Sequence, residues 1–285
     1  MIYIDGQYYT KEDAKISVFD HGLLYGDGVF EGIRIYNHRI FKLKEHVKRL
    51  YESARTIHLT IAMQPPELED LLNQMVARSG KQNGYIRLVV TRGDGPLGID
   101  PEKCPRSRMI IIVDDIQLYP MEFYEKGIEI ITASYRRIPV DCLDPRIKSL
   151  NYLNNVLAKI EAKQNNCLES VMLNTAGFVT ECTADNIFNV KDNVLKTPAT
   201  YHGVLAGITR SVILEIGDRL GLKPEEGTLT RFDLYNADEC FLSGTGAEII
   251  PVVRVDRITI GNGRPGLVTG KIRTQYNEMI NQLEN

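Results

Sequence analysis

Two short segments of the chain combine glycine with hydroxyl residues in an order that can bind an anion. In residues 205–210 (LAGITR), Gly207 and Thr209 stand where an amphipathic helix begins. Free N–H groups and the helix dipole attract phosphate at such a terminus. In residues 243–246 (SGTG), small residues between two apolar segments allow successive N–H groups to form an anion-binding turn. The simpler interpretations, a capped helix and an ordinary connection, stay open at this point.

Other enzyme motifs are matched only in part or not at all. Residues 93–98 (GDGPLG) have the glycine spacing of a dinucleotide-binding loop, but prolines follow where that loop needs a helix, so we expect a surface loop. The five histidines are isolated from one another, and we therefore predict no metal site. The sequence lacks the nucleophile elbow of the α/β-hydrolases and the P-loop.

Composition excludes several classes of protein. The 285 residues include 34 Lys and Arg against 37 Asp and Glu, and a near-neutral chain without a basic block gives no footprint for nucleic acid. No apolar segment approaches the roughly 18 residues of a membrane span, and the N-terminus lacks a signal-peptide pattern. We therefore expect a cytoplasmic protein with no membrane or nucleic-acid partner. The five cysteines are odd in number and scattered, which indicates reduced thiols, mostly buried.

Hydrophobic periodicity predicts helices and strands in an irregular order. In the first half we predict strands at 28–36, 39–43, 85–91 and 109–113, the last buried on both faces, and helices at 43–57 and from 65 to Gly80. In the second half we predict strands at 128–132, 170–173, 178–180, 186–190, 239–242 and 249–255, and helices at 149–164, 207–220 and 267–283.

These elements predict an α+β fold, because helices and strands mix without a regular β-α-β order. A chain of this length is near the size at which single cores stop growing, so we expect two domains. Polar and turn-prone residues between the two halves mark the boundary. We predict a small N-terminal α/β domain at 1–120, a linker at 121–127 and a larger C-terminal domain at 128–285.

Seven segments of the chain resemble, in order, those of the fold-type IV pyridoxal-phosphate (PLP) enzymes, and specifically the branched-chain amino-acid aminotransferases. They are residues 19–34 (FDHGLLYGDGVFEGIR), 46–50 (HVKRL), 84–87 (GYIR), 146–152 (RIKSLNY), 180–188 (TECTADNIF), 207–210 (GITR) and 243–248 (SGTGAE). The resemblance covers nearly the whole chain. It implies the two-domain architecture of the D-amino-acid aminotransferase-like enzymes, with PLP carried by the C-terminal domain.

The resemblance also implies which residues surround the cofactor. Lys148 would be the lysine that binds the PLP aldehyde and moves the substrate proton. Glu181 would be the carboxylate at the pyridine nitrogen, and Tyr152 the tyrosine at the phenolic oxygen. Arg49 matches the arginine that binds the phosphate, although the helical pattern alone places it in solvent. The other implied cofactor contacts are Leu205, Gly207, Ile208, Thr209 and Thr245.

On the substrate side, the resemblance implies a pocket lined by Tyr25, Phe30, Gly32, Tyr85, Arg87 and Gly246. Alternation along the strand at 85–91 puts Tyr85 and Arg87 on one face, where Arg87 would pair with the distal carboxylate of glutamate. The N–H groups of Thr245 and Gly246 would hold the α-carboxylate. Leucine would need only apolar contact.

We therefore expect a homodimer, or an assembly of dimers, that transaminates L-leucine, L-isoleucine and L-valine with 2-oxoglutarate, giving 2-oxo acids and L-glutamate. A D-amino-acid transaminase is the main alternative, but its Thr-Arg-Gly run leads to a histidine, whereas Asp94 follows residues 91–93 (TRG) here. Aminodeoxychorismate lyase is not expected to keep both FEGIR and GYIR. A catalytically silent ligand-binding homologue has no need of both Lys148 and Glu181.

Overall fold

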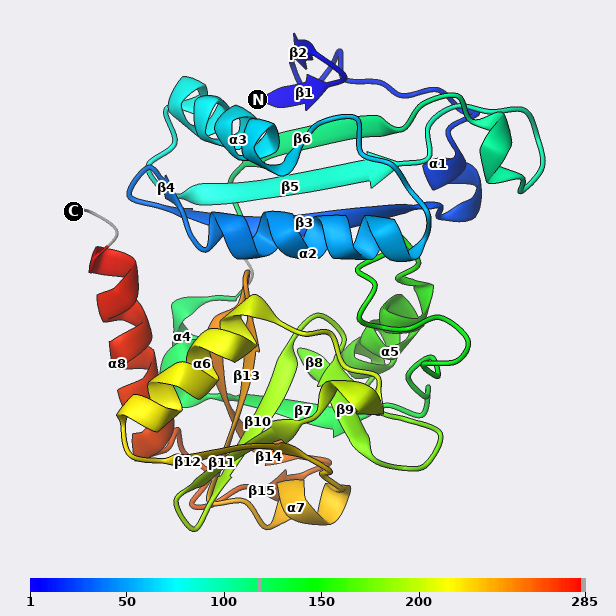
Figure 1. The fold of residues 1–285 in the computed structure, drawn as a ribbon. Helices are drawn as coiled ribbons and strands as arrows, with labels where there is room; N and C mark the ends of the chain where they lie inside the picture. Colours follow the sequence, from blue (N-terminus) through cyan, green and yellow to red (C-terminus); the bar gives the residue numbers. More distant parts are fainter. Residues whose placement is uncertain (117–118, 283–285) are drawn as a thin grey trace. The chain divides into compact units, whose positions relative to one another are not determined.

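The computed structural model describes residues 1–116 and 119–282 and divides the chain into two compact units (Figure 1). Unit 1 contains residues 1–116, 147–151 and 280–285, and unit 2 contains residues 117–146 and 152–279. The predicted α+β class is confirmed by the helices and sheets of both units. The domain limits at 1–120 and 128–285 stay a prediction, and residues 117–118, beside that boundary, lie outside the described residues. At the predicted linker, helix α4 (Met121–Lys126) forms.

Unit 1 contains an antiparallel sheet with the strand order β2-β1-β6-β5-β3-β4. The strands are β1 (Ile2–Ile4), β2 (Gln7–Tyr9), β3 (Gly28–Tyr36), β4 (Arg39–Ile40), β5 (Gly84–Thr91) and β6 (Arg108–Asp114). The helices are α1 (His21–Tyr25), α2 (Leu43–Thr56) and α3 (Pro65–Ser79), with a 3₁₀ turn at Pro101–Lys103. Helix α2 runs along β3 and contacts α3 (Figure 1).

Alternation along the strands of unit 1 separates a buried face from a half-exposed one. Ile33 of β3 and Leu88 of β5 are fully buried in one cluster with Leu50 of α2. The prediction that β6 is buried on both faces is wrong, since Ile110 and Ile112 are only half-buried. The reason is that α2 and α3 join the core on one side of the sheet. On the other side of the sheet, the side chains of β5 and β6 are half-buried.

The two long helices of unit 1 follow the predicted limits. Pro65 and Pro66 occupy the first turn of α3, where a missing N–H is tolerated, and the Gln64 and Glu67 side chains form a capping box. Gly80 ends the helix with a φ of 67°, a left-handed conformation that glycine adopts without strain. Local sequence therefore sets both ends of α3.

Unit 2 contains a mixed sheet with the strand order β12-β11-β10-β13-β14-β7-β8-β9, and β15 pairs with β14. The strands are β7 (Ile128–Thr132), β8 (Glu169–Leu173), β9 (Val179–Cys182), β10 (Asn186–Lys191), β11 (Val194–Pro198), β12 (Lys223–Gly227), β13 (Glu239–Gly244), β14 (Glu248–Val255) and β15 (Ile258–Thr259). The helices other than α4 are α5 (Leu153–Gln164), α6 (Ile208–Arg219), α7 (Arg231–Tyr235) and α8 (Leu267–Asn281), with a 3₁₀ turn at Thr200–His202.

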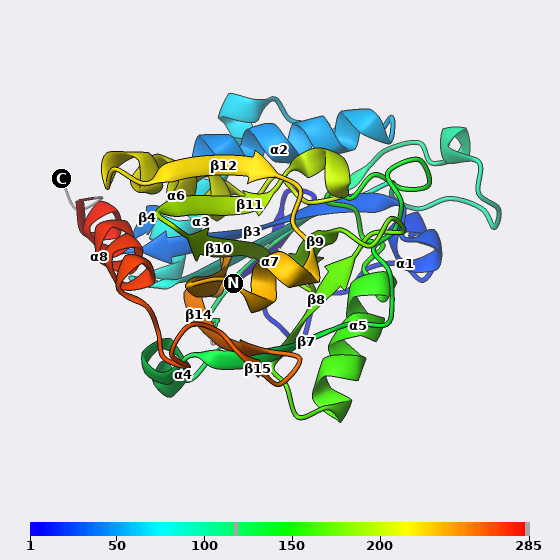
Figure 2. The same ribbon diagram turned by 90° about the horizontal axis from the view of Figure 1, so that it is seen from below.

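Helices α4, α5 and α6 of unit 2 contact its sheet, α4 at β14. Figure 2 shows α5 beside β8, and α6 contacts β12 and β13. The predicted closing helix is present as α8, while Leu283 lies outside the described residues. Within the described part of the chain, no helix combines the length and apolar character that a bilayer-spanning segment needs.

Residues 147–151, which we call the 147–151 segment, correct the predicted helix at 149–164, because α5 begins only at Leu153. The Phe30 N–H donates to the Lys148 carbonyl at 2.9 Å, and the Leu150 N–H donates to the Gly28 carbonyl at 3.0 Å. These bonds fix the segment along the beginning of β3. Its backbone groups are therefore engaged by a distant strand rather than by a helix.

Candidate active site

Five of the predicted site residues gather on the half-exposed face of the unit 1 sheet. The register of β3 and β5 places Gly32 opposite Arg87. The guanidinium carbon of Arg87 lies 4.7 Å from the centre of the Phe30 ring and 5.4 Å from the centre of the Tyr85 ring. The Nζ atom of Lys148 lies 4.4 Å from the centre of the Phe30 ring. Two cations therefore contact the Phe30 ring.

Gly32 makes room for this arrangement. A Cβ atom at position 32 would lie 1.7 Å from the Tyr85 hydroxyl oxygen. Any side chain here would displace the Tyr85 ring, because contacts this short are impossible. Glycine at this position therefore determines where the Tyr85 hydroxyl lies.

The backbone of Lys148 is held by two elements of unit 1. Its N–H donates to the Ser53 hydroxyl of α2 at 3.2 Å, and its carbonyl accepts from the Phe30 N–H of β3. Leu150 continues the contact with β3. The amine of Lys148 therefore projects from a segment that is fixed at both the helix and the sheet.

Arg49 does not lie in solvent, so the expectation from the helical pattern is wrong. Its side chain is 11% exposed, and its Nε and Nη2 atoms donate to the two carboxylate oxygens of Glu31 at 2.7 and 2.8 Å. His46 Nδ1 lies 2.8 Å from Glu31 Oε2. His46, Arg49 and Ser53 form a polar stripe on α2 beside the apolar one, and this stripe is covered by Glu31 and the 147–151 segment.

The charges in this cluster follow from burial and pairing. Burial alone would raise the pKa of Glu31, but the Arg49 charge and the hydrogen bonds from Arg49 and His46 hold that pKa well below its usual range. Burial lowers the pKa of His46 despite its bond to Glu31. At neutral pH, Glu31 is therefore ionised and His46 is neutral.

Tyr25 lies with a different segment of unit 1. Its hydroxyl accepts a hydrogen bond from the Gly98 N–H at 2.9 Å, and its ring packs edge-on against His21. His21 in turn lies 3.0 Å from the Pro96 carbonyl oxygen. Residues 93–98 thus form a loop over α1 instead of opening a helix, as predicted.

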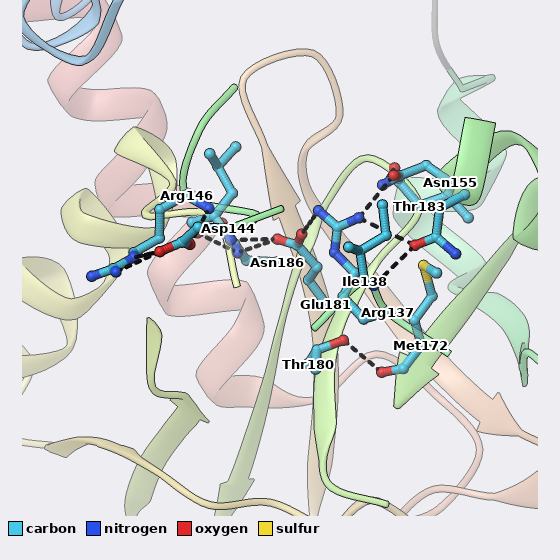
Figure 3. Close-up of polar contacts among 12 residues, drawn as sticks. Arg137, Ile138, Asp144, Arg146, Asn155, Met172, Thr180, Glu181, Thr183 and Asn186 are labelled. Carbon is cyan, nitrogen blue, oxygen red and sulfur yellow. Dashed lines mark hydrogen bonds and ion pairs between the residues drawn. The ribbon is translucent and has the colours of Figure 1, made fainter. Parts of the chain in front are cut away.

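In unit 2, Glu181 is the centre of a buried polar network (Figure 3). Arg137 Nη2 lies 2.8 Å from Glu181 Oε1, and the Leu205 N–H donates to Oε2 at 2.9 Å. The Asn186 amide approaches the same oxygen at 3.4 Å. Arg137 is itself oriented by Asn155 Oδ1 at 2.9 Å. Both carboxylate oxygens of Glu181 are therefore fixed by donors, and its charge is paired.

The beginning of α6 has the character of an anion site. Gly207 is the N-cap residue, no side chain caps the helix, and the Ser211 N–H makes the first bond back to the Gly207 carbonyl. Ile208 and Thr209 are buried. A Cβ at Gly207 would lie 2.0 Å from Asn186 Oδ1, so only glycine fits where the backbone passes this side chain. The first N–H groups of the helix are thus oriented for an acceptor.

The remaining predicted residues of unit 2 lie in a turn and at a helix start. Thr245 and Gly246 are half-buried in the turn between β13 and β14. A Cβ on the preceding residue, Gly244, would lie 2.1 Å from Asp185 Oδ1, so this turn passes close to the start of β10. Tyr152 is half-buried at the N-cap position of α5.

The sequence did not identify Glu31, His46, Arg137 and Asn186 as residues that contact the predicted site residues. A signal existed for Glu31, since it interrupts an apolar alternation in β3 with a charge. No pattern distinguishes Arg137, which follows another arginine in an irregular segment. Among the described residues, no group of acidic, histidine or cysteine side chains could hold a metal ion, and all five cysteines are free thiols, three of them buried.

Comparison with known proteins gives consistent results. The family model of the class IV amino-transferases matches residues 28–255. A putative branched-chain-amino-acid aminotransferase of Methanocaldococcus jannaschii is 48% identical over 278 residues, 98% of this chain and 96% of the relative. A D-alanine aminotransferase of Listeria monocytogenes is 36% identical over 282 residues, 98% of this chain and 96% of the relative.

Solved structures show the same similarity. The branched-chain amino acid aminotransferase of Escherichia coli superposes with a TM-score of 0.95 at 34% identity, over 98% of this chain and 94% of the other. A second such aminotransferase, crystallised with pyridoxamine 5'-phosphate, superposes with a TM-score of 0.94 at 36% identity. Its complex with N-(5'-phosphopyridoxyl)-L-glutamate superposes with a TM-score of 0.92 at the same identity. Both of these alignments cover 98% of this chain and 93% of the other.

Proposed function

Because the chain belongs to the class IV aminotransferases, we propose that it transfers the amino group of L-leucine, L-isoleucine and L-valine to 2-oxoglutarate, with PLP as its cofactor. The observation that carries the proposal is that the Arg87 guanidinium and the Lys148 amine both contact the Phe30 ring. Such a surface offers apolar contact to an aliphatic side chain and a cation to a second carboxylate. Both substrates of the reaction therefore find a partner on one strand face.

The residues present fit PLP in both units. Lys148 offers a primary amine for the aldehyde, and the uncapped start of α6 offers N–H donors for the phosphate. Glu181 is a carboxylate whose two oxygens are fixed by Arg137 and by the Leu205 N–H, and it is suited to contact the ring nitrogen. When bound, PLP supplies the carbon that exchanges amines and a ring that accepts electrons. The cofactor forms crystallised with the second aminotransferase structure support this assignment.

In this proposal, each side chain of the site has a separate role. Lys148 would hold the cofactor aldehyde through its amine, and the free amine would take the proton from the substrate Cα and return it. Glu181 would hold the proton at the ring nitrogen. Tyr152 donates to the phenolic oxygen, and Leu205 packs against the ring. Arg49, Gly207, Ile208, Thr209 and Thr245 bind the phosphate.

Substrate recognition in this proposal uses the aromatic face and the β13–β14 turn. Phe30 and Tyr85 contact the aliphatic side chain, and Arg87 pairs with the distal carboxylate of glutamate. Among the described residues, no acidic side chain forms an ion pair with Arg87, whose contacts are the two rings. The N–H groups of Thr245 and Gly246 hold the α-carboxylate. Tyr25 and Gly32 complete the lining.

A D-amino-acid transaminase is the second candidate, favoured by the similarity to the Listeria D-alanine aminotransferase. Half-reaction spectroscopy separates the two, since loss of the cofactor's aldehyde absorbance reports both substrate and stereochemistry. We expect conversion with L-leucine, L-isoleucine, L-valine and L-glutamate, and none with D-alanine. Conversion by D-amino acids alone would overturn the proposal.

We also propose that the chain works in the cytoplasm as a homodimer or an assembly of dimers. Support comes from exposed apolar side chains of unit 1, since Leu23 is 62% exposed, Leu97 72% and Ile99 81%. These residues belong to α1 and to the loop that is hydrogen-bonded to it, and exposed apolar side chains of this kind are typical of an interface. Light scattering after size-exclusion chromatography tests the assembly, and a monomer at micromolar concentration would contradict it.

A further inference from the structure

Glu31 is a carboxylate on a strand face that is otherwise apolar. Its neighbours on this face of β3, Val29 and Ile33, are fully buried, and so is Glu31 itself. Burying an unpaired carboxylate is strongly unfavourable, so such a residue persists only where its partners are fixed. The partners of Glu31 are Arg49 and His46, three residues apart on α2.

The pairing with Arg49 fixes an orientation as well as a distance. Nε and Nη2 of Arg49 face Oε1 and Oε2 of Glu31 at 2.7 and 2.8 Å, which is a side-on, bidentate pair. Such a pair leaves the planar guanidinium one orientation, in which Nη1 points away from Glu31. The direction of the outer edge of Arg49 is therefore set by Glu31.

His46 completes the fixation of the carboxylate. Because burial lowers the pKa of His46, its imidazole is neutral, and Nδ1, which lies 2.8 Å from Glu31 Oε2, carries the proton and donates it to that oxygen. Nε2 of His46 is buried and has no hydrogen-bond partner in the part of the chain described. A neutral His46 adds a hydrogen bond without adding a second positive charge. The charge of Glu31 is thus balanced by the Arg49 guanidinium alone in this cluster.

We propose that Glu31 is a positioning residue for cofactor binding: it fixes the Arg49 guanidinium in the orientation that binds the PLP phosphate, and His46 holds the second carboxylate oxygen. This inference rests on the proposed function. The same polar stripe of α2 carries Ser53, which binds the backbone of Lys148. One helix face therefore holds both the arginine assigned to the phosphate and the segment that carries the lysine.

Positioning and simple electrostatics predict opposite effects of removing the Glu31 charge. Glu31 partly cancels the charge of Arg49, so Glu31→Gln would strengthen the binding of a phosphate if charge alone mattered. If orientation matters, the variant loses one of two bidentate bonds, the guanidinium turns, and phosphate binding weakens. The sign of the change therefore decides between the two explanations.

The experiment compares the dissociation constants of PLP and pyridoxal for the full-length apoenzyme, measured by absorbance titration. Pyridoxal has the same aldehyde and ring but no phosphate, so the ratio of the two constants isolates the phosphate contact. We expect Glu31→Gln to reduce the preference for PLP at least about tenfold, the loss expected for a charge-assisted bond. Arg49→Lys should also reduce the preference for PLP over pyridoxal. In the double variant Glu31→Gln/Arg49→Lys, this preference should be no lower than in Arg49→Lys alone.

The controls separate this inference from damage to the fold and from failure of the proposed function. Asp27→Asn breaks another bidentate pair of unit 1, with Arg92 at 2.9 Å, and should lower the melting temperature without changing the ratio. If Glu31→Gln does not fold, His46→Gln takes its place with a several-fold loss of preference expected. An unchanged or increased preference in the folded variant overturns the inference. If Arg49→Lys has no effect, Arg49 does not bind the phosphate. If the wild-type chain binds neither compound, the proposed function itself fails.

Discussion

Replacing Arg87 with methionine tests how one pocket accepts both leucine and glutamate. The guanidinium of Arg87 lies over Phe30 and beside Tyr85, and its removal leaves an apolar side chain of similar length on the same strand face. The distal carboxylate of glutamate would then be buried without a counter-charge. Leucine carries no such group, so its contacts with the rings should persist.

The size of the effect follows from the interactions that the variant loses. A hydrogen bond to a charged group contributes about 1.5 to 3 kcal/mol net, and each 1.36 kcal/mol is a factor of ten in rate. We therefore expect kcat/KM for L-glutamate and 2-oxoglutarate to fall about 10- to 150-fold. The lost cation–π contacts with Phe30 and Tyr85 contribute about 0.5 to 1 kcal/mol, which limits the loss with L-leucine to about two- to fivefold.

Single-turnover absorbance measurements of the two half-reactions provide the assay, since each substrate is followed separately. Arg87→Lys is the matched control, because lysine keeps the positive charge but not the planar guanidinium. Its kcat/KM for L-glutamate should fall less than that of Arg87→Met. An equal loss with leucine and glutamate would refute the reasoning and make Arg87 a structural residue. Conversion of D-amino acids alone by the wild type would refute the substrate assignment.

Three further outcomes are expected. Lys148→Ala should lose transamination by orders of magnitude, and borohydride reduction of the wild type should attach the cofactor to Lys148; attachment to another lysine would contradict this. Glu181→Gln should still bind PLP but slow proton removal from L-leucine, because a neutral amide does not hold the ring proton; unchanged single-turnover rates would place Glu181 elsewhere. Since the pKa of Glu31 lies below its usual value of 4.5, its contribution to stability is present above that pH and lost as pH falls below it. The difference in melting temperature between the wild type and Glu31→Gln should therefore shrink as pH falls below 4.5, and parallel curves would exclude this.

The pattern of apolar and polar residues along the sequence predicted those helices and strands that begin and end at characteristic residues of their own segment. Helix α3 is the best case, since Pro65 and Pro66 begin it, Leu68 and Leu72 face the core, and Gly80 ends it. The fold class follows from the same kind of information. Burial of apolar side chains dominates these elements, and its periodicity is visible in the sequence.

Local pattern failed where the partners come from distant parts of the chain. A helical pattern sorts residues into apolar and polar, so it assigns Arg49 to solvent, whereas Glu31 from β3 covers it. Ser149 falls within a predicted helix, but it pairs with Val29 instead. Arg137 reaches Glu181 from an irregular segment that carries no periodicity. The resemblance supplied the roles of the site residues, and those roles stay predictions until the variants are measured.

Because the chain is synthesised from its N-terminus, the 147–151 segment determines when the first strand residues of β3 in unit 1 can pair. Residues 1–116 emerge first, yet the Phe30 N–H and the Gly28 carbonyl acquire their partners only when Lys148 and Leu150 emerge. Until then, residues 117–146 of unit 2 are synthesised while the beginning of β3 remains an open edge, which is a site for wrong pairing with other chains. The lysine that we propose to bind the cofactor is thus synthesised together with the backbone groups that pair with this edge.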